Sequence, residues 1–217
     1  HTVTVDAGTY YEHVVLNKTL SLIGENKTNT VIDGNGTGTV IQIRADYVKI
    51  TGLTIKNKGE EPSPSLIGID VLLSNGNNIS HNILIENNFG IWLSGSSGDV
   101  ITDNNVLLNK YSGIVVSDSS SISLSENIVS NNNFGITLAG STGNLLTDNN
   151  ASSNTKDGIY LYSSNSNIIA NSNTFTNNNT GIWLSTSSDN IISNNNIFLN
   201  DAGGIHMSES PRNLFTG

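Results

Sequence analysis

Short apolar pieces alternate along the chain with runs of serine, threonine and asparagine, and this pattern repeats at a nearly constant interval. The dipeptide Gly-Ile marks the repeat. It returns after 22 or 23 residues, with its glycine at Gly68, Gly90, Gly113, Gly135, Gly158, Gly181 and Gly204. A serine stands six residues after each of these glycines. Self-similarity at such an interval is typical of a solenoid, in which each repeat packs only against its neighbours.

Three apolar pieces in every repeat predict three strands. The first follows the glycine, as in Ile91-Trp92-Leu93, the second centres on a position such as Ile101, and the third on one such as Leu107. Polar turn formers separate the pieces, so a repeat of this length has no room for a helix. The Leu-x-x-Leu-x-Leu frame of a leucine-rich repeat is missing. We therefore predict an all-β fold, a single-stranded right-handed parallel β-helix of about ten turns with three short strands per turn.

The pattern predicts a single domain over residues 1–217, with two parts of different regularity. Residues 68–217 carry the regular repeats, whereas residues 1–67 contain strand-like pieces without a clean copy of the repeat. Residues 57–66 include Pro62 and Pro64. Because proline cannot donate a hydrogen bond inside a sheet, we predict irregular N-terminal turns that end in an exposed loop over 57–66.

Asparagine forms two further columns in the repeat. Identical positions of neighbouring turns stack at about 4.8 Å, so a buried amide can bond its copies above and below. We predict an inward ladder at a bend from the column eight residues before each glycine: Asn82, Asn105, Asn127, Asn150, Asn173 and Asn196. A second column, four residues before the glycine, holds Asn109, Asn131, Asn154, Asn177 and Asn200, with Glu86 in the first turn and Asn87 beside it. A chemical role for these amides is the alternative to this structural one.

Composition and charge narrow the class of protein. Hydrophobic residues make up 35% of the chain, which is enough for a core, and the formal net charge is −9. With only nine lysines and arginines, a nucleic-acid partner is not expected. No apolar stretch reaches the length of a membrane span. Cysteine is absent, which excludes disulfides and thiolate metal sites and fits an exported protein that gains its stability in other ways.

Aromatic residues gather in one column of the predicted strand that follows each glycine. Since Ile69 and Val71 point inward, the residue between them points outward. That column reads Asp70, Trp92, Val115, Thr137, Tyr160, Trp183 and His206, and Tyr162 neighbours it. Exposed aromatic rings stack on sugar rings, so the candidate carbohydrate-binding residues are Trp92, Tyr160, Tyr162, Trp183 and His206. The alternatives are contact with another protein and a simple preference of aromatic residues for strands.

Acidic residues gather in a second column, just before the predicted asparagine ladder. It begins with His81 and continues with Asp103, Glu126 and Asp148. Carboxylates about 5 Å apart on successive turns can hold Ca²⁺ or serve glycoside hydrolysis. A solvated corner is the simpler interpretation, and the continuation of the column as Asn171 and Asn194 favours it. We therefore expect no catalytic residue, metal or cofactor, with Asp103, Glu126 and Asp148 as the candidates for catalysis or Ca²⁺ binding if this interpretation is wrong.

Two segments resemble a known family. The segment "AGTYYEHVVLNKTLSLIGENKTNTVIDGNG", residues 7–36, resembles the first turns of pectin lyase-like proteins, in particular NosD-like and carbohydrate-binding and sugar-hydrolase (CASH) domains. The segment "NIISNNNIFLNDAGGIHM", residues 190–207, is similar to the parallel β-helix repeat of surface proteins of methanogenic archaea. The resemblance covers nearly the whole chain. It implies the β-helix fold, because the matching residues belong to core, bends and ladders.

The resemblance implies a choice between a surface protein and a polysaccharide-active enzyme. The family includes polysaccharide lyases, glycosidases, epimerases, adhesins and surface-layer proteins. Its catalytic motifs do not carry over, since the chain has no Gly-His-Gly, no Asp-Asp pair and no arginine cluster. The copper link of NosD-like proteins finds little support in four scattered histidines, one methionine and no cysteine. We predict a non-catalytic extracellular surface or envelope domain, such as a surface layer, sheath or adhesin, with a lyase, glycoside hydrolase or epimerase as the alternative.

Two kinds of partner follow from this prediction. One is a polysaccharide or other glycan. The other is a neighbouring copy of the chain, because a β-helix exposes unpaired strand edges at its first and last turns. Val3 and Val5 alternate in a strand at the start of the sequence, and Leu214 and Phe215 stand at its end where core residues belong. We expect these end turns to stack on further turns.

Overall fold

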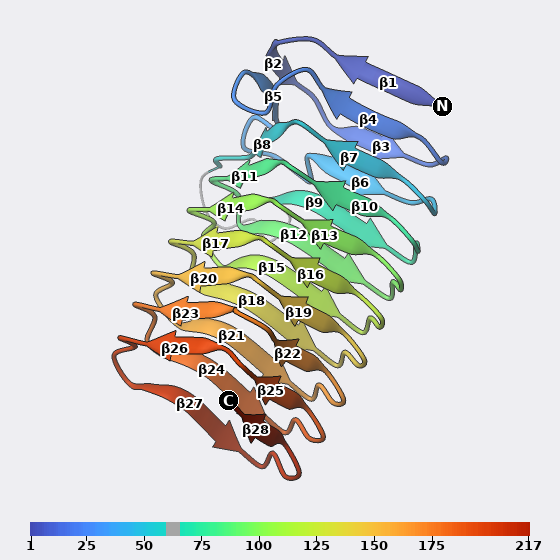
Figure 1. The fold of residues 1–217 in the computed structure, drawn as a ribbon. Helices are drawn as coiled ribbons and strands as arrows, with labels where there is room; N and C mark the ends of the chain where they lie inside the picture. The colour runs from blue at the N-terminus through green and yellow to red at the C-terminus, as the bar shows by residue number, and fades with distance from the viewer. Residues whose placement is uncertain (60–65) are drawn as a thin grey trace.

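The computed structural model describes residues 1–59 and 66–217. Their 28 strands form three parallel sheets that run side by side along the whole molecule (Figure 1). The chain visits the three sheets in the order A, B, C and then starts the next turn, so each strand pairs with its counterparts one turn away. The sheets contain ten, nine and nine strands, which gives nine complete turns and the first strand of a tenth. The predicted parallel β-helix with three short strands per turn is confirmed.

Each sheet takes every third strand of the chain. Sheet A contains β1 (Thr2–Val5), β4 (Ser21–Gly24), β7 (Lys49–Thr51), β10 (Asn78–Ser80), β13 (Val100–Thr102), β16 (Ser123–Ser125), β19 (Leu145–Thr147), β22 (Ile168–Ala170), β25 (Ile191–Ser193) and β28 (Leu214–Thr216). Sheet B contains β2 (Gly8–Tyr11), β5 (Thr30–Asp33), β8 (Thr54–Lys56), β11 (Ile83–Ile85), β14 (Asn105–Leu107), β17 (Ile128–Ser130), β20 (Asn150–Ser152), β23 (Thr174–Thr176) and β26 (Asn196–Phe198).

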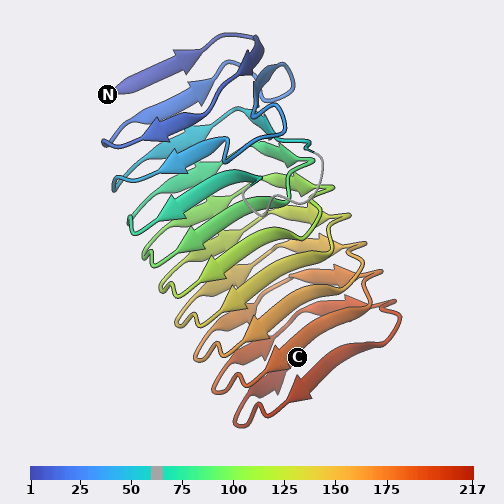
Figure 2. The ribbon, with the colours of Figure 1, turned by 180° about the vertical axis from the view of Figure 1, so that it is seen from behind.

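Sheet C has the longest strands, because it begins at the repeated glycine. It contains β3 (Val14–Leu16), β6 (Ile41–Ile43), β9 (Ile67–Leu72), β12 (Phe89–Ser94), β15 (Ser112–Ser117), β18 (Phe134–Ala139), β21 (Asp157–Tyr162), β24 (Thr180–Ser185) and β27 (Gly203–Ser208). Figure 2 shows these strands stacked across the opposite side of the molecule. The strands of residues 1–59 join the same three sheets as the regular repeats. Of the predicted loop over 57–66, residues 60–65 lie outside the described residues.

The core is one continuous column of aliphatic side chains inside the solenoid. Each turn contributes inward residues from all three sheets, such as Ile101 from sheet A, Val106 from sheet B and Ile114 from sheet C, and all three are fully buried. The repeated glycine stands where the chain bends into sheet C. A Cβ atom at Gly135 would lie 2.4 Å from the carbonyl oxygen of Gly158 on the next turn, so the close approach of the two backbones requires glycine there.

Asparagine ladders line two bends, as predicted, but their register is corrected. The first ladder separates sheets A and B and consists of Asn82, Asn104, Asn127, Asn149, Asn173 and Asn195. In its centre Asn127 Nδ2 donates to Asn149 Oδ1 at 2.9 Å and to the carbonyl oxygen of Ile101 at 2.8 Å. The prediction was right at three positions and wrong at Asn105, Asn150 and Asn196, which begin strands of sheet B instead.

The second ladder separates sheets B and C and shows the cause of these errors. It consists of Asn87, Asn109, Asn132, Asn154, Asn178 and Asn200. Its distance to the next glycine alternates between three and four residues, so counting backward by a fixed offset fails in alternate turns. The predicted Asn131 and Asn177 lie one residue earlier, are exposed and have φ values of 57° and 55°.

Two further columns stabilise the bend between sheets C and A. In the serine column, six residues after each glycine, backbone N–H groups donate to the serine hydroxyl of the next turn, as from Ser96 to Ser119 at 3.1 Å. Three residues later a third amide ladder contains Asn77, Asn144, Asn167, Asn190 and Asn213. Two turns interrupt this third ladder, where Asp99 and Ile122 take the place of asparagine. No cysteine and no disulfide contributes.

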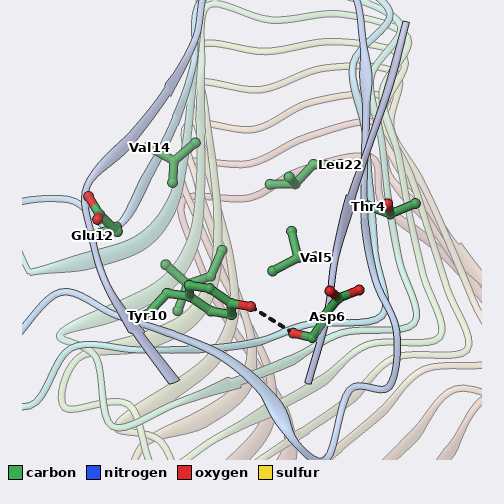
Figure 3. Close-up of a pocket in the computed structure, with 8 residues that line it drawn as sticks. Thr4, Val5, Asp6, Tyr10, Glu12, Val14 and Leu22 are labelled. Atoms are coloured by element: carbon green, nitrogen blue, oxygen red, sulfur yellow. Dashed lines mark hydrogen bonds between the residues drawn. The ribbon is translucent and has the colours of Figure 1, made fainter. Parts of the chain in front are cut away.

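The first turn leaves the end of the core open. A hollow of about 330 Å³ there is lined by Val5, Tyr10, Val14, Leu22 and neighbouring residues, and Tyr10 donates to the carbonyl oxygen of Asp6 (Figure 3). Core residues of the last turn are also open, since Ile205 is 41% exposed. A further turn of polypeptide would cover either end. Whether another copy of the chain does so stays a prediction.

Candidate glycan-binding face

The outer face of sheet C holds the predicted aromatic column. Backbone pairing places Trp92 opposite Asp70 and Val115, and it places Tyr160 opposite Thr137 and Trp183 in the same row. His206 completes the row on the last strand, opposite Trp183. The isoleucines and leucines on either side of these residues are buried in the core on most turns. The backbone pairing thus matches the predicted column, although Val115 within it is only 6% exposed.

The rings of the last turns contact one another. Ring centroids lie 5.7 Å apart between Phe134 and Tyr160, 6.4 Å between Tyr160 and Tyr162, 6.0 Å between Tyr160 and Trp183, and 4.9 Å between Trp183 and His206. These five residues are called the lower aromatic cluster. Tyr162 is 50% exposed, and His206 is also exposed. The cluster is thus a surface of connected rings that spans four turns.

A second group of rings lies on the same face, on the turns of β12 and β15 directly above the turn of Phe134. Phe89 contacts Trp92 edge-on at 4.7 Å and Tyr111 at 5.3 Å. Lys110 Nζ stands 5.2 Å from the centre of the Tyr111 ring. Val115 and Thr137 separate this upper group from the column residues of the lower aromatic cluster. At the edge of the face the two groups adjoin, since the backbone N–H of Phe134 donates to the carbonyl oxygen of Tyr111 at 2.7 Å.

Sequence reasoning missed Phe89, Phe134 and Tyr111. All three stand in or next to the corner that precedes sheet C, one or two residues before the repeated glycine. The strict alternation of a strand does not extend into a corner, so their direction could not be derived. A usable signal was the aromatic residue directly before Gly-Ile in two alternate turns, at Phe89 and Phe134.

A small pocket adjoins the lower aromatic cluster. It has a volume of about 210 Å³ and is lined by Asn179, Thr180, Trp183, Ala202, Gly203, Ile205 and His206. Its walls come from β24, β27 and the corner between sheets B and C. The recess therefore combines the aromatic rings of Trp183 and His206 with the polar side chains of Asn179 and Thr180.

A buried carboxyl group stands beside this pocket. Asp157 is 1% exposed, and its Oδ1 atom has no hydrogen-bond partner among the described residues. Burial raises its pKa to about 6, although a hydrogen bond from Thr180 and the positive charges of Lys156 and His206 act in the opposite direction. Trp183 Nε1 is another buried polar atom without a partner in the described part of the chain. Sequence reasoning did not single out Asp157, because an aspartate before glycine is a common turn residue.

Charged residues on this face are concentrated at its upper end. Arg44 donates to Asp70 at 2.8 Å and to Gln42 at 3.2 Å, just above Trp92. Asp70 and His206 are the two titratable residues of the outward column, apart from the tyrosine, and this ion pair neutralises the charge of Asp70. The arginine is therefore held by a carboxylate and does not form the start of a cationic cluster.

The predicted acidic column lies on a different part of the surface, at the corner between sheets A and B. Asp103, Glu126 and Asp148 are exposed, and their φ values are 53°, 57° and 55°. His81 and Asn171 share this left-handed conformation at the same corner, with φ values of 58° for both. Aspartate and asparagine tolerate this conformation better than most residues. The local backbone thus accounts for the residue types, as the solvated-corner interpretation expected.

The first two residues of this column lie close together at the surface. His81 Nδ1 lies 2.5 Å from Asp103 Oδ2, and both side chains are more than half exposed. Among residues 1–59 and 66–217, no group of three or more histidine, cysteine, aspartate or glutamate side chains is placed to hold a metal ion. The predictions of a catalytic or Ca²⁺ role for Asp103, Glu126 and Asp148 have not been tested.

A three-sheet parallel β-helix with amide ladders and an aromatic outer face defines a protein of the pectin lyase-like class. The model of the NosD family, described as periplasmic copper-binding protein (NosD), matches residues 12–121 and 68–217. These matches cover most of the sequence, and the chain belongs to the NosD family. A comparison with curated protein sequences gives no significant match.

Solved structures with the same fold include enzymes and a viral protein. The periplasmic alginate epimerase AlgG aligns with a TM-score of 0.64 and 16% identity over 99% of this chain and 72% of its own. DFA-IIIase from Arthrobacter chlorophenolicus A6 without its lid gives a TM-score of 0.67 and 15% identity over 98% and 82%. ORF18 of Geobacillus virus E2 gives 0.69 and 12% over 100% and 53%. At these identities the likeness concerns the fold alone.

The residues present do not form a copper site of their own. Copper is held in proteins mainly by imidazole, thiolate and thioether groups. The chain has four histidines, one methionine and no cysteine. His13 bonds to Thr39 and Thr37, His81 pairs with Asp103, and His206 packs on Trp183. Because the histidines lie in separate surroundings, no set of ligands in the described chain fits the metal that the family description names.

Proposed function

We propose that this chain is a glycan-binding domain of an extracytoplasmic protein, which holds a polysaccharide against the outer face of sheet C. The lower aromatic cluster carries the proposal. Its rings are connected, partly exposed and adjacent to a pocket with polar walls. Aromatic rings bind the apolar faces of sugars while polar groups at their edges accept or donate hydrogen bonds. The description of the family as periplasmic supports placement outside the cytoplasm.

The proposed domain is non-catalytic and belongs to a cell-surface or envelope structure. The exposed acidic column stands on a corner, and none of its carboxylates lines the pocket beside the lower aromatic cluster. Glycoside hydrolysis needs two carboxyl groups that flank one bond in a recess. The carboxyl group of Asp157 hydrogen-bonds to Thr180 in the wall of the recess beside the lower aromatic cluster. The residues that form this recess therefore suit binding better than hydrolysis.

A polysaccharide-active enzyme is the second candidate. It is favoured by one observation, namely that Asp157 combines a raised pKa with a position near His206. An acid and a base so placed can exchange protons with a substrate. An enzyme of this kind would release or alter product from a bound polysaccharide, and the Asp157→Asn variant would lose that activity while the exposed Asp148→Asn variant kept it.

Calorimetric titration of an oligosaccharide panel tests the binding proposal. We expect at least one glycan to bind, and we expect Trp183→Ala to weaken its binding by about tenfold, because the largest ring of the cluster is lost. Phe198→Ala is the matched control, since Phe198 is an aromatic residue on the outer face of sheet B, 49% exposed and on a neighbouring turn. Equal losses in both variants, or no binding at millimolar glycan, would contradict the proposal.

A further inference from the structure

The pocket beside the lower aromatic cluster combines rings with a negative charge behind them. Asp157 stands in the row of Thr180, one turn above it, and Trp183 follows Thr180 by three residues. One turn earlier, Phe134 and Tyr160 stand in the same relation to each other, and their rings stack with centroids 5.7 Å apart. Asp157 thus occupies the place in its row that Phe134 occupies one turn earlier, and its hydrogen-bond partner Thr180 lines the pocket. Its Oδ1 atom is buried without a hydrogen-bond partner among the described residues.

The groups around Asp157 leave it without a fixed counter-ion. On its own strand, Lys156 precedes it and is exposed. On β24 it meets the neutral Thr180, and on β27 the nearest charged group is His206. The neighbouring strand β18 contains no charged residue. None of the ion pairs among the described residues includes Asp157. A buried carboxylate with one hydrogen bond and no fixed counter-ion attracts a cation strongly.

Aromatic faces add to this attraction. The face of tryptophan or tyrosine binds an ammonium group at close range through its ring quadrupole, and a ring cage is a usual form of such a site. Tyr160, Trp183 and His206 form a row of neighbouring rings on three successive turns, and Trp183 and His206 line the pocket together with Thr180, the hydrogen-bond partner of Asp157. A neutral sugar would use the rings but not the carboxylate. A uronate would bring a second negative charge toward Asp157, in a chain whose net charge is already −9.

We propose that the pocket of Thr180, Trp183 and His206 selects glycans that carry a positively charged amino group, with Asp157 as the buried anion that provides the selectivity. The inference rests on the proposed glycan-binding function and specifies its ligand class. A cationic amino sugar placed on the Trp183 ring is attracted by the carboxylate, a neutral sugar is indifferent to it, and a uronate is repelled. At charge separations within a protein surface site the expected preference is about tenfold between cationic and neutral sugars.

Three oligosaccharides of equal length test this selectivity. One is an N-trimethylated glucosamine oligomer, whose charge does not change with pH, the second is the N-acetylated oligomer, and the third is an oligogalacturonate. Their dissociation constants for the whole chain are measured by calorimetry at pH 7.5 and at pH 5. We expect the cationic oligomer to bind about tenfold more tightly than the neutral one at pH 7.5, and we expect this ratio to shrink at pH 5, where Asp157 is protonated.

Asp157→Asn and Asp157→Ser separate the carboxylate from the rest of the pocket. Serine is the native residue at the equivalent place on β15, at Ser112, so this variant keeps the fold. Both variants should lose the preference for the cationic oligomer over the neutral one. Equal or tighter binding of the oligogalacturonate, or an unchanged preference in both variants, overturns the inference, whereas binding of none of the three refutes the proposed function itself.

Discussion

Asp99 offers a sharp test of how the amide ladders stabilise the solenoid. It is the one acid in the third amide ladder, and its Oδ1 atom accepts from the backbone and side chain of Asn77 at 2.7 and 2.8 Å. Its Oδ2 atom is buried without a partner. In later turns the ladder nitrogen at this place donates to a serine-column carbonyl, as from Asn167 to Ser141 at 3.1 Å. At Asp99 an oxygen replaces that donor and faces the equivalent carbonyl of Ser74.

The charged form of Asp99 is therefore unfavourable in the folded protein. Burial raises its pKa from 3.8 to about 6, and the charge of Asp46 adds to the rise while the bonds from Asn77 oppose it. Since one pKa unit corresponds to about 1.36 kcal/mol, ionised Asp99 costs up to about 3 kcal/mol of stability. Because the folded-state pKa of Asp99 is raised, the protein is free of this cost below pH 3.8. The corresponding stability is lost as the pH rises through about 6.

Asp99→Asn restores a nitrogen donor to the ladder. One of its N–H groups can bond to the Ser74 carbonyl, but the other faces Ile122 and finds no acceptor, at a cost of about 1 kcal/mol. The variant should thus exceed the wild type in free energy of unfolding by about 2 kcal/mol at pH 7.5, and this difference should fall to within about 1 kcal/mol at pH 4. Urea denaturation at both values measures it.

Asp148→Asn is the matched control, because Asp148 is exposed at a corner where the next turn already has Asn171. It should change the unfolding free energy by less than about 0.5 kcal/mol at either pH. The raised pKa of Asp157 affects every variant equally and cancels from the comparison. A difference for Asp99→Asn that stays constant with pH, or a less stable variant at pH 7.5, would refute the reasoning.

Three further predictions concern the solenoid. Asn149→Leu should lower the unfolding free energy by roughly 3 kcal/mol or more, because Asn149 bonds to Asn127, Asn173 and two carbonyls; Asn150→Leu should cost far less, and equal denaturation midpoints would contradict the corrected register. Gly135→Ala should lower the thermal midpoint by several degrees, since its Cβ atom meets a carbonyl at 2.4 Å. Millimolar Ca²⁺ should leave the wild-type melting temperature unchanged, and a clear rise would revive the acidic column as a metal site.

The sequence allowed the strands and the outer face of sheet C to be predicted because strand alternation starts from an invariant glycine. From Gly158 or Gly181, counting forward fixes the direction of Tyr160 and Trp183, and no corner intervenes. Counting backward crosses a corner of variable length, and for that reason Asn150 was taken for its neighbour Asn149. The periodicity alone does not show which corner has the extra residue.

The pocket could not be predicted from the sequence, for a different reason. Asp157 and Thr180 lie 23 positions apart, and their meeting with His206 depends on side chains from three turns at once. A repeat pattern shows which positions share a row, but it does not show how far each side chain is covered. Neighbouring side chains bury Asp157 and leave Asp157 Oδ1 and Trp183 Nε1 without hydrogen-bond partners among the described residues.

Tryptophan emission tests the central claim, that a glycan binds against the outer face of sheet C, most directly. The chain has two tryptophans, so the Trp92→Phe variant leaves Trp183 as the single reporter in the lower aromatic cluster. A glycan identified on an array is titrated against this variant while its emission and the integrity of the glycan are followed. The account predicts a saturable change in Trp183 emission and an intact glycan. Binding that leaves Trp183 emission unchanged would contradict it.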